Sequence, residues 1–188
     1  MPYHIIPASA RTVSRWAGGT TEQLFIWPEG ADYTRRDFAL RVSTAAVELD
    51  ESGFTPLADF TRWIMPLSGV LTLEHEGHGG ASLAPLITHR FEGGWSTRSK
   101  GRCVDFNLML AAGWDGIITG EPGAHRCEAG AFAGVYAFAG PAMVAVGGET
   151  IHLAARDVLI LRGPGALALP EGQRAAVFVA RPVGAGDS

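Results

Sequence analysis

VLTLEHEGHGGASLAPLITHRF, residues 70–91, and MVAVGGETIHLAARDVLIL, residues 143–161, are the two stretches that decide the fold. Each begins with alternating residues, turns at a glycine-rich group, returns, and passes through a Leu-Ala step into a further strand. VDFNLML, residues 104–110, follows the first stretch, and AVFVAR, residues 176–181, follows the second. The chain therefore reads as a weak internal repeat of one antiparallel unit.

The rest of the sequence also predicts strands. FALRVSTAAVEL, residues 38–49, is long enough for a helix, but its β-branched residues and its period of two favour a strand. The 25 glycines in 188 residues are about twice the usual frequency and suit many short strands joined by turns. We therefore predict an all-β double cupin, with two consecutive jelly-roll-like antiparallel barrels. The first barrel would span residues 1–113 and the second, mainly structural, residues 114–188.

Composition limits the partners. A net charge of −4 argues against binding nucleic acid, which requires a basic surface. No apolar run approaches the ~18 residues of a membrane span, and the N-terminus lacks the pattern of a signal peptide. Cys103 and Cys127 form no Cys-x-x-Cys pair, so two reduced thiols in a cytoplasmic protein are expected.

A polar pair distinguishes the first copy from the second. If Phe106 and Phe178 are equivalent, Asp105 and Asn107 stand where the second copy has two valines. Buried polar groups need partners, so an inward-facing pair implies a network, ordered water or a ligand. The alternative is that this face looks out to solvent. The pair thus makes the first barrel the candidate for a polar pocket.

Two arginines belong to the same hypothesis. Arg41 lies on the face of its strand that carries Ser43, and Arg62 opens a later strand. The planar guanidinium matches a carboxylate in a two-pronged contact. Either these arginines hold a ligand, or they form an internal salt bridge such as Arg41 to Asp105.

Signals for metal or covalent catalysis are weak. His75 and His78 fall in a glycine-rich hairpin, where a solvated loop is more expected than a rigid set of three or four metal ligands. GGTT, residues 18–21, is followed by no Lys-Ser/Thr, and no Gly-x-Ser-x-Gly appears. We expect no metal, no cofactor and no catalytic nucleophile.

The chain resembles the HutD/Ves family of small bicupins. The matching segments, in the family's order, are WAGGTTEQL (16–24), FALRVSTAAVE (38–48), SGFTPLADFTRWIMPLSGVLTLEH (52–75) and DFNLM (105–109). Many members have an Asn and three glycines after the tryptophan, where this chain has Trp16-Ala17-Gly18-Gly19-Thr20. A contact that depends on that Asn is therefore not carried over.

The resemblance implies a double cupin fold of the RmlC-like superfamily, no required metal and a cytoplasmic setting. Some relatives accompany enzymes of histidine utilisation and are thought to bind a small acidic metabolite such as N-formylglutamate; others are linked to stress responses. Carried over by motif, the candidate site comprises Trp16, Thr20, Glu22, Arg41, Ser43, Arg62, Asp105 and Asn107.

These observations favour a regulatory binding protein over an enzyme. Arg62, or else Arg41, would hold a carboxylate, with Asn107 and Thr20 as hydrogen-bonding groups. Asp105 would orient an arginine, and Trp16 would close one wall. Two alternatives stay open: a metal-free isomerase or lyase of a small carboxylic acid, with Glu22 or Asp105 as general base, and a protein-interaction module that uses edge strands. A homodimer also stays open.

Overall fold

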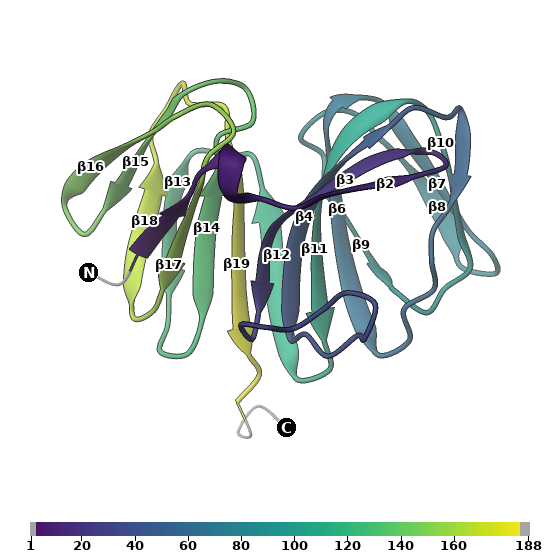
Figure 1. Cartoon of the computed structure of the whole chain (residues 1–188), viewed down its shortest axis with the longest axis horizontal. Helices are drawn as coiled ribbons and strands as arrows, with labels where there is room; N and C mark the ends of the chain where they lie inside the picture. The colour runs from purple at the N-terminus through teal and green to yellow at the C-terminus, as the bar shows by residue number, and fades with distance from the viewer. Residues whose placement is uncertain (1–2, 185–188) are drawn as a thin grey trace. The chain divides into compact units, whose positions relative to one another are not determined.

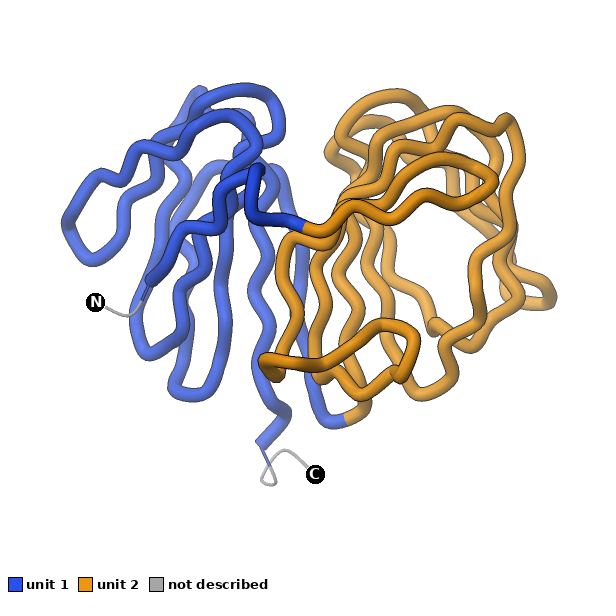
Figure 2. Tube along the Cα trace, viewed as in Figure 1, with its two compact units in different colours: residues 1–11, 113–188 blue, residues 12–112 orange. Residues whose placement is uncertain are grey.

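The computed structural model describes residues 3–184, and these are almost entirely β-structure (Figure 1). The chain divides into two compact units: residues 12–112 form unit 2, and the described residues 3–11 and 113–184 form unit 1 (Figure 2). The one helix within residues 3–184 is a short 3-10 turn, Ala8–Ala10. None of the described helices is long and apolar enough to cross a membrane.

Unit 2 consists of two antiparallel sheets. The six-stranded sheet has the order β2-β3-β4-β11-β6-β9, and the four-stranded sheet has the order β5-β10-β7-β8. Leu71, Leu73 and Phe91 are fully buried in a core cluster of this unit. The strands are β2 (Val13–Trp16), β3 (Gly19–Trp27), β4 (Leu40–Val47), β5 (Glu51–Gly53), β6 (Phe60–Gly69), β7 (Leu71–His75), β8 (Gly79–Leu83), β9 (His89–Glu92), β10 (Thr97–Lys100) and β11 (Cys103–Ala111).

Unit 1 repeats this arrangement. Its five-stranded sheet has the order β1-β17-β14-β19-β12, and its four-stranded sheet has the order β13-β18-β15-β16. Val135, Leu159 and Val177 belong to its core cluster, which is apolar throughout. The strands are β1 (Tyr3–Ile6), β12 (Trp114–Thr119), β13 (Gly123–Cys127), β14 (Phe132–Tyr136), β15 (Ala142–Val146), β16 (Glu149–Leu153), β17 (Val158–Arg162), β18 (Gly165–Leu169) and β19 (Ala176–Pro182).

The internal repeat is confirmed by the topology. The hairpin β7–β8 in the first stretch corresponds to β15–β16 in the second, and each pairs into a four-stranded sheet of the same connectivity. The predicted all-β double cupin is therefore the observed fold. The segment 38–49 is extended over Leu40–Val47, as its period of two predicts.

The beginning of the chain departs from a division into consecutive segments. Strand β1 pairs antiparallel with β17, Tyr3 opposite Leu161, so it completes the sheet of unit 1 and not the unit that follows it in sequence. A four-residue strand carries too little pattern to specify its partner, and the open edge of β17 provides one.

Candidate ligand-binding site

A cavity of about 310 Å³ lies against one face of the six-stranded sheet of unit 2. The register of three strands builds its floor, because Met109 on β11 lies between Arg41 on β4 and Arg62 on β6. Alternation then brings every second residue of these strands to the same face. The lining comprises Ser14, Trp16, Thr21, Tyr33, Arg41, Ser43, Ala45, Val47, Ser52, Gly53, Phe54, Thr55, Arg62, Asp105, Asn107 and Met109.

Arg62 is buried in this cavity with few partners. Only 6% of the residue is exposed, and its Nη1 donates a long hydrogen bond of 3.5 Å to the Thr55 carbonyl. Its guanidinium carbon lies 4.7 Å from the ring centre of Phe54 and 5.3 Å from that of Phe91. Its Nε has no hydrogen-bond partner among residues 3–184. Burial lowers the pKa of Arg62 to about 10, so the guanidinium stays charged and poorly satisfied at neutral pH.

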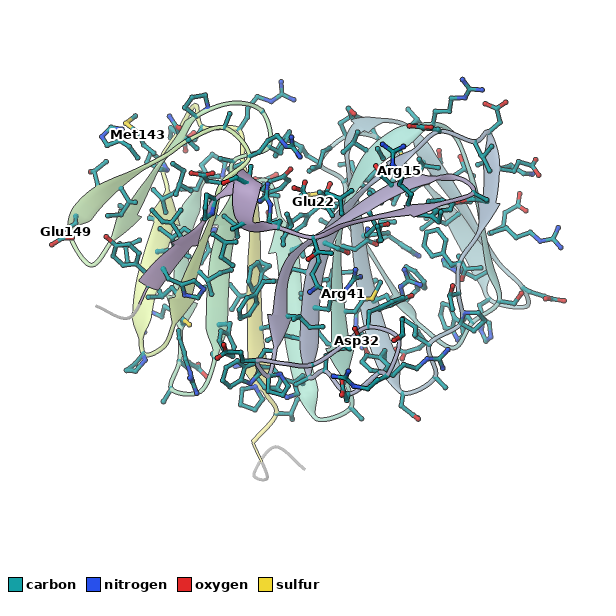
Figure 3. All side chains as sticks on the ribbon, viewed as in Figure 1. Arg15, Glu22, Asp32, Arg41, Met143 and Glu149 are labelled. Atoms are coloured by element: carbon teal, nitrogen blue, oxygen red, sulfur yellow. The ribbon has the colours of Figure 1, made fainter. Side chains whose placement is uncertain are left out.

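Arg41 is held mainly by neutral groups. Its Nε donates to Gln23 Oε1 at 3.1 Å and its Nη1 to Ser43 Oγ at 3.2 Å. The ring of Tyr33 lies 4.5 Å from its guanidinium carbon, and burial lowers the pKa of Arg41. In Figure 3, Arg41 marks this part of unit 2. These contacts fix the side chain without neutralising its charge.

Asp105 is the acidic group of the cavity, and 3% of it is exposed. Its Oδ1 accepts a hydrogen bond from Asn107 Nδ2. Burial raises the pKa of Asp105 to about 7, although the Asn107 hydrogen bond and the charge of Arg62 both oppose the rise. The carboxyl therefore exchanges a proton near neutral pH.

No salt bridge compensates the two arginines. Within the described residues, neither Arg41 nor Arg62 has a carboxylate oxygen within 4.0 Å, so the salt bridge from Arg41 to Asp105 is not formed. Two guanidiniums thus face one partly protonated carboxyl in a low-dielectric cavity. The site has an excess of positive charge, which suits a small anion with oxygen acceptors.

Six of the eight residues suggested by the sequence line this cavity: Trp16, Arg41, Ser43, Arg62, Asp105 and Asn107. Thr20 and Glu22 do not. Strand β3 alternates, so Thr21 faces the cavity between them, and the register places Thr21 opposite Ala45 on the same face as Ser43. Glu22 is buried away from the cavity lining and is labelled in Figure 3.

The role expected for Asp105 also differs from its contacts. It was expected to orient an arginine, but its side chain accepts a hydrogen bond from Asn107 instead. The walls contributed by Tyr33, Phe54 and Thr55 were not anticipated either. These residues follow no strand periodicity, because they lie in segments between strands, and no motif marks them.

His75 is not in a solvated loop, contrary to the expectation. It is the last residue of β7, 4% exposed, with Nδ1 2.8 Å from Thr97 Oγ1 and Nε2 3.0 Å from His89 Nε2. Burial lowers the pKa of His75 and of His89. His78 does lie in the turn and stacks on Trp95, with ring centres 4.2 Å apart. Across the described chain, no three His, Cys, Asp or Glu side chains gather as metal ligands would.

Solved structures similar to this chain share its fold. HutD from Pseudomonas fluorescens SBW25, in a formate condition, superposes with a TM-score of 0.76 at 23% identity, covering 97% of this chain and all of that one. PA5104 from Pseudomonas aeruginosa PAO1, a conserved protein of unknown function, gives 0.76 at 23% identity over 96% and 98% of the two chains. The pirin YhhW from Escherichia coli, in complex with nickel(II), gives 0.67 at 12% identity over 96% and 99%.

Sequence comparison is more specific than these superpositions. No curated protein matches the chain. The family model described as HutD matches residues 8–179, which is nearly the whole chain and includes every residue of the cavity. The protein therefore belongs to the HutD family.

Proposed function

We propose that the cavity of unit 2 binds a small acidic metabolite, with N-formylglutamate as the first compound to test, and that the protein is a regulatory binding protein. A cytoplasmic role linked to histidine utilisation or to a stress response is part of this proposal. The observation that carries it is Arg62, a residue that is only 6% exposed and whose guanidinium lacks a carboxylate partner among the described residues and leaves its Nε unpaired.

A bound carboxylate would supply the negative charge and the hydrogen-bond acceptors that Arg62 lacks. It would accept from Arg62 and Arg41, which approach the floor on either side of Met109. Asn107, Ser43 and Thr21 offer neutral hydrogen-bonding groups along the same face. A volume of about 310 Å³ is at the small end of ligand pockets, which favours a metabolite over a larger cofactor.

The direct test is a thermal-shift series with N-formylglutamate, glutamate, urocanate and histidine, each beside an analogue in which a carboxylate is replaced by an amide. At a hundred times its dissociation constant, a bound ligand stabilises the native state by about 2.7 kcal/mol. We expect acidic compounds to shift the unfolding temperature and their amides not to. Equal shifts with acid and amide, or no shift with any compound, would contradict the proposal.

Adjacent threonines on β3 provide a matched pair of variants. Thr21 lines the cavity and Thr20 does not, so Thr21→Val removes a hydroxyl from the site while Thr20→Val removes one outside it. One lost hydrogen bond is worth about 1 kcal/mol, so we expect Thr21→Val to weaken carboxylate binding roughly fivefold in calorimetric titration. Thr20→Val should bind like the wild type. The opposite ranking would place the ligand elsewhere.

A metal-free isomerase or lyase is the second candidate, and the raised pKa of Asp105 is what favours it. A carboxyl with a pKa of about 7 is suited to general acid–base catalysis at neutral pH. Glu22 does not line the cavity, so Asp105 is the base to test. Incubation of a bound carboxylic acid in heavy water distinguishes the two functions. Exchange of a ligand C–H proton that is lost in Asp105→Asn supports catalysis, whereas an unchanged ligand supports binding alone.

A further inference from the structure

Unit 1 contains a cavity of its own, of about 350 Å³. It lies between β12 and β13, which are end strands of the two sheets, and β19 completes its wall. Every residue that lines it belongs to unit 1. This cavity is separate from the one that carries the proposed function.

His125 on β13 is the uncharged polar side chain of this cavity. Its Nε2 is buried and has no hydrogen-bond partner within residues 3–184. Burial lowers the pKa of His125, so the imidazole is neutral at physiological pH, with one N–H and one lone pair. A buried nitrogen without a partner is costly, and a ligand that reaches it would recover that cost.

The opposite wall is apolar. Ile117 on β12 pairs with Val179 on β19, and both line the cavity together with Ala131. Ile117 is 46% exposed, although it lies in the middle of its strand. An exposed branched side chain and a half-buried imidazole that line the same cavity suit a ligand with an apolar body and one polar end.

The rim of the cavity has no net charge. Arg181 lies opposite Asp115 in the strand register and 3.7 Å from Glu128, and Arg126 supplies the second cation. Two acidic and two basic side chains produce no excess field of either sign. This distinguishes the cavity from that of unit 2, where two arginines face one carboxyl, and it disfavours a charged ligand.

The internal repeat relates the two cavities. Strands β12, β13 and β19 have the topological places of β4, β5 and β11, because β12 pairs with β19 as β4 pairs with β11. With Phe178 equivalent to Phe106, the apolar pair Val179–Ile117 stands where unit 2 has Asn107–Ser43. The duplicated unit thus retains a cavity at the same place, with a different lining.

We propose that this cavity is a second small-molecule site, and that it takes an uncharged molecule with a compact apolar body and a hydroxyl group. The hydroxyl would pair with His125 Nε2 after a rotation of the imidazole toward the cavity, because Nε2 is buried in the ligand-free structure. A hydroxyl can form this pair with either tautomer because it both donates and accepts. The apolar body would cover Ile117 and Val179. Unit 1 is then a binding unit whose selectivity differs from that of unit 2, in addition to its structural role.

Phenol is a suitable probe, with toluene as the matched compound that lacks the hydroxyl. Titrated into the whole ¹⁵N-labelled protein, phenol at millimolar concentration is expected to shift amide resonances of β12, β13 and β19. Toluene should bind about tenfold more weakly. His125→Phe, which keeps the ring and removes the nitrogens, should weaken phenol binding about tenfold, and Ile117→Trp, which fills the cavity from an exposed position, should abolish it.

Arg62→Met provides the control, because it alters the cavity of unit 2 and should leave phenol binding unchanged. The proposal would be overturned if phenol shifted no amide resonances of β12, β13 and β19. It would also be overturned if phenol still bound to both His125→Phe and Ile117→Trp. Equal binding of toluene and phenol would overturn the hydroxyl recognition. None of these results depends on whether unit 2 binds a carboxylate.

Discussion

Arg62→Met is expected to raise the stability of the ligand-free protein and to remove its stabilisation by small carboxylates. Arg62 is only 6% exposed, and its guanidinium has one long hydrogen bond and no ion pair within the described chain, so the native state bears the cost of its desolvation. The pKa of Arg62, lowered by burial to about 10, has the same cause. Replacement of buried ion pairs by apolar side chains of similar volume is often neutral or stabilises proteins by about 1–4 kcal/mol, and Arg62 has no ion pair within the described chain to offset its desolvation. We expect a gain of about 1–3 kcal/mol, because the contacts with Phe54 and Phe91 are partly lost.

The measurement is urea unfolding of both proteins with and without a carboxylate ligand. The slope of the unfolding free energy against urea concentration should be the same in both proteins, so that a change of midpoint reports a change of stability. Arg98→Met is the matched control, because Arg98 is exposed on β10 and its replacement should change neither stability nor binding. A less stable Arg62→Met protein that keeps its full response to carboxylates would show that Arg62 serves the fold alone. Higher stability together with lost ligand binding is typical of replacing a group that is retained for function at the expense of stability.

The sequence predicted which residues line the cavity best where the strands have a regular period of two. Arg41 and Ser43 on one strand, with Asp105 and Asn107 on another, share a face because alternate residues of a strand point the same way. The contrast with the second copy also holds, since Val177 lies in an apolar core and Val179 packs against it. Fold and cavity floor thus followed from periodicity and repetition.

The sequence did not predict the lining where it depends on which alternate residues of a strand face the cavity, or on the course of a loop. Thr20 and Glu22 were assigned by motif. The motif has polar residues on both faces of β3, so it does not show which of the two faces lines the cavity. A register shift between Gln23 and Phe25 then changes the phase within the same strand. Tyr33 reaches Arg41 from an irregular segment, and no periodicity foretells such a contact.

The burial of His75 and the cavity of unit 1 were missed for another reason. A Gly-rich sequence around His75 indicates a turn, but the strand β7 extends to that residue and carries it inward. In the second copy, the apolar residues of β19 predict a filled core, whereas the cavity opens between strands β12 and β13 at the sheet ends. Packing between sheets, which a single sequence does not encode locally, decides both features.

Asp105→Asn is expected to make the protein more stable above neutral pH and to remove one component of its pH dependence. Because the folded-state pKa is raised from 3.8 to about 7, the native state binds more protons than the unfolded chain between these values. The contribution of Asp105 is therefore fully present below about pH 4, is lost as pH rises to about 7, and stays lost above it. A rise of about three pKa units corresponds to roughly 4 kcal/mol, as an upper bound for a fully buried group. Asn at this position keeps the oxygen that accepts from Asn107 and carries no charge.

The quantity to measure is the difference in unfolding free energy between Asp105→Asn and wild type at a series of pH values from 4 to 9. The difference should be smallest near pH 4, rise through pH 5–7 and level off above it. His75 and His89 act in the opposite direction, because their lowered pKa values make the native state lose stability on acidification below about 6.5, but they contribute equally to both proteins and cancel. A flat profile for Asp105→Asn would mean that Asp105 is ionised in the native state throughout this range, and it would remove the support for Asp105 as a general base.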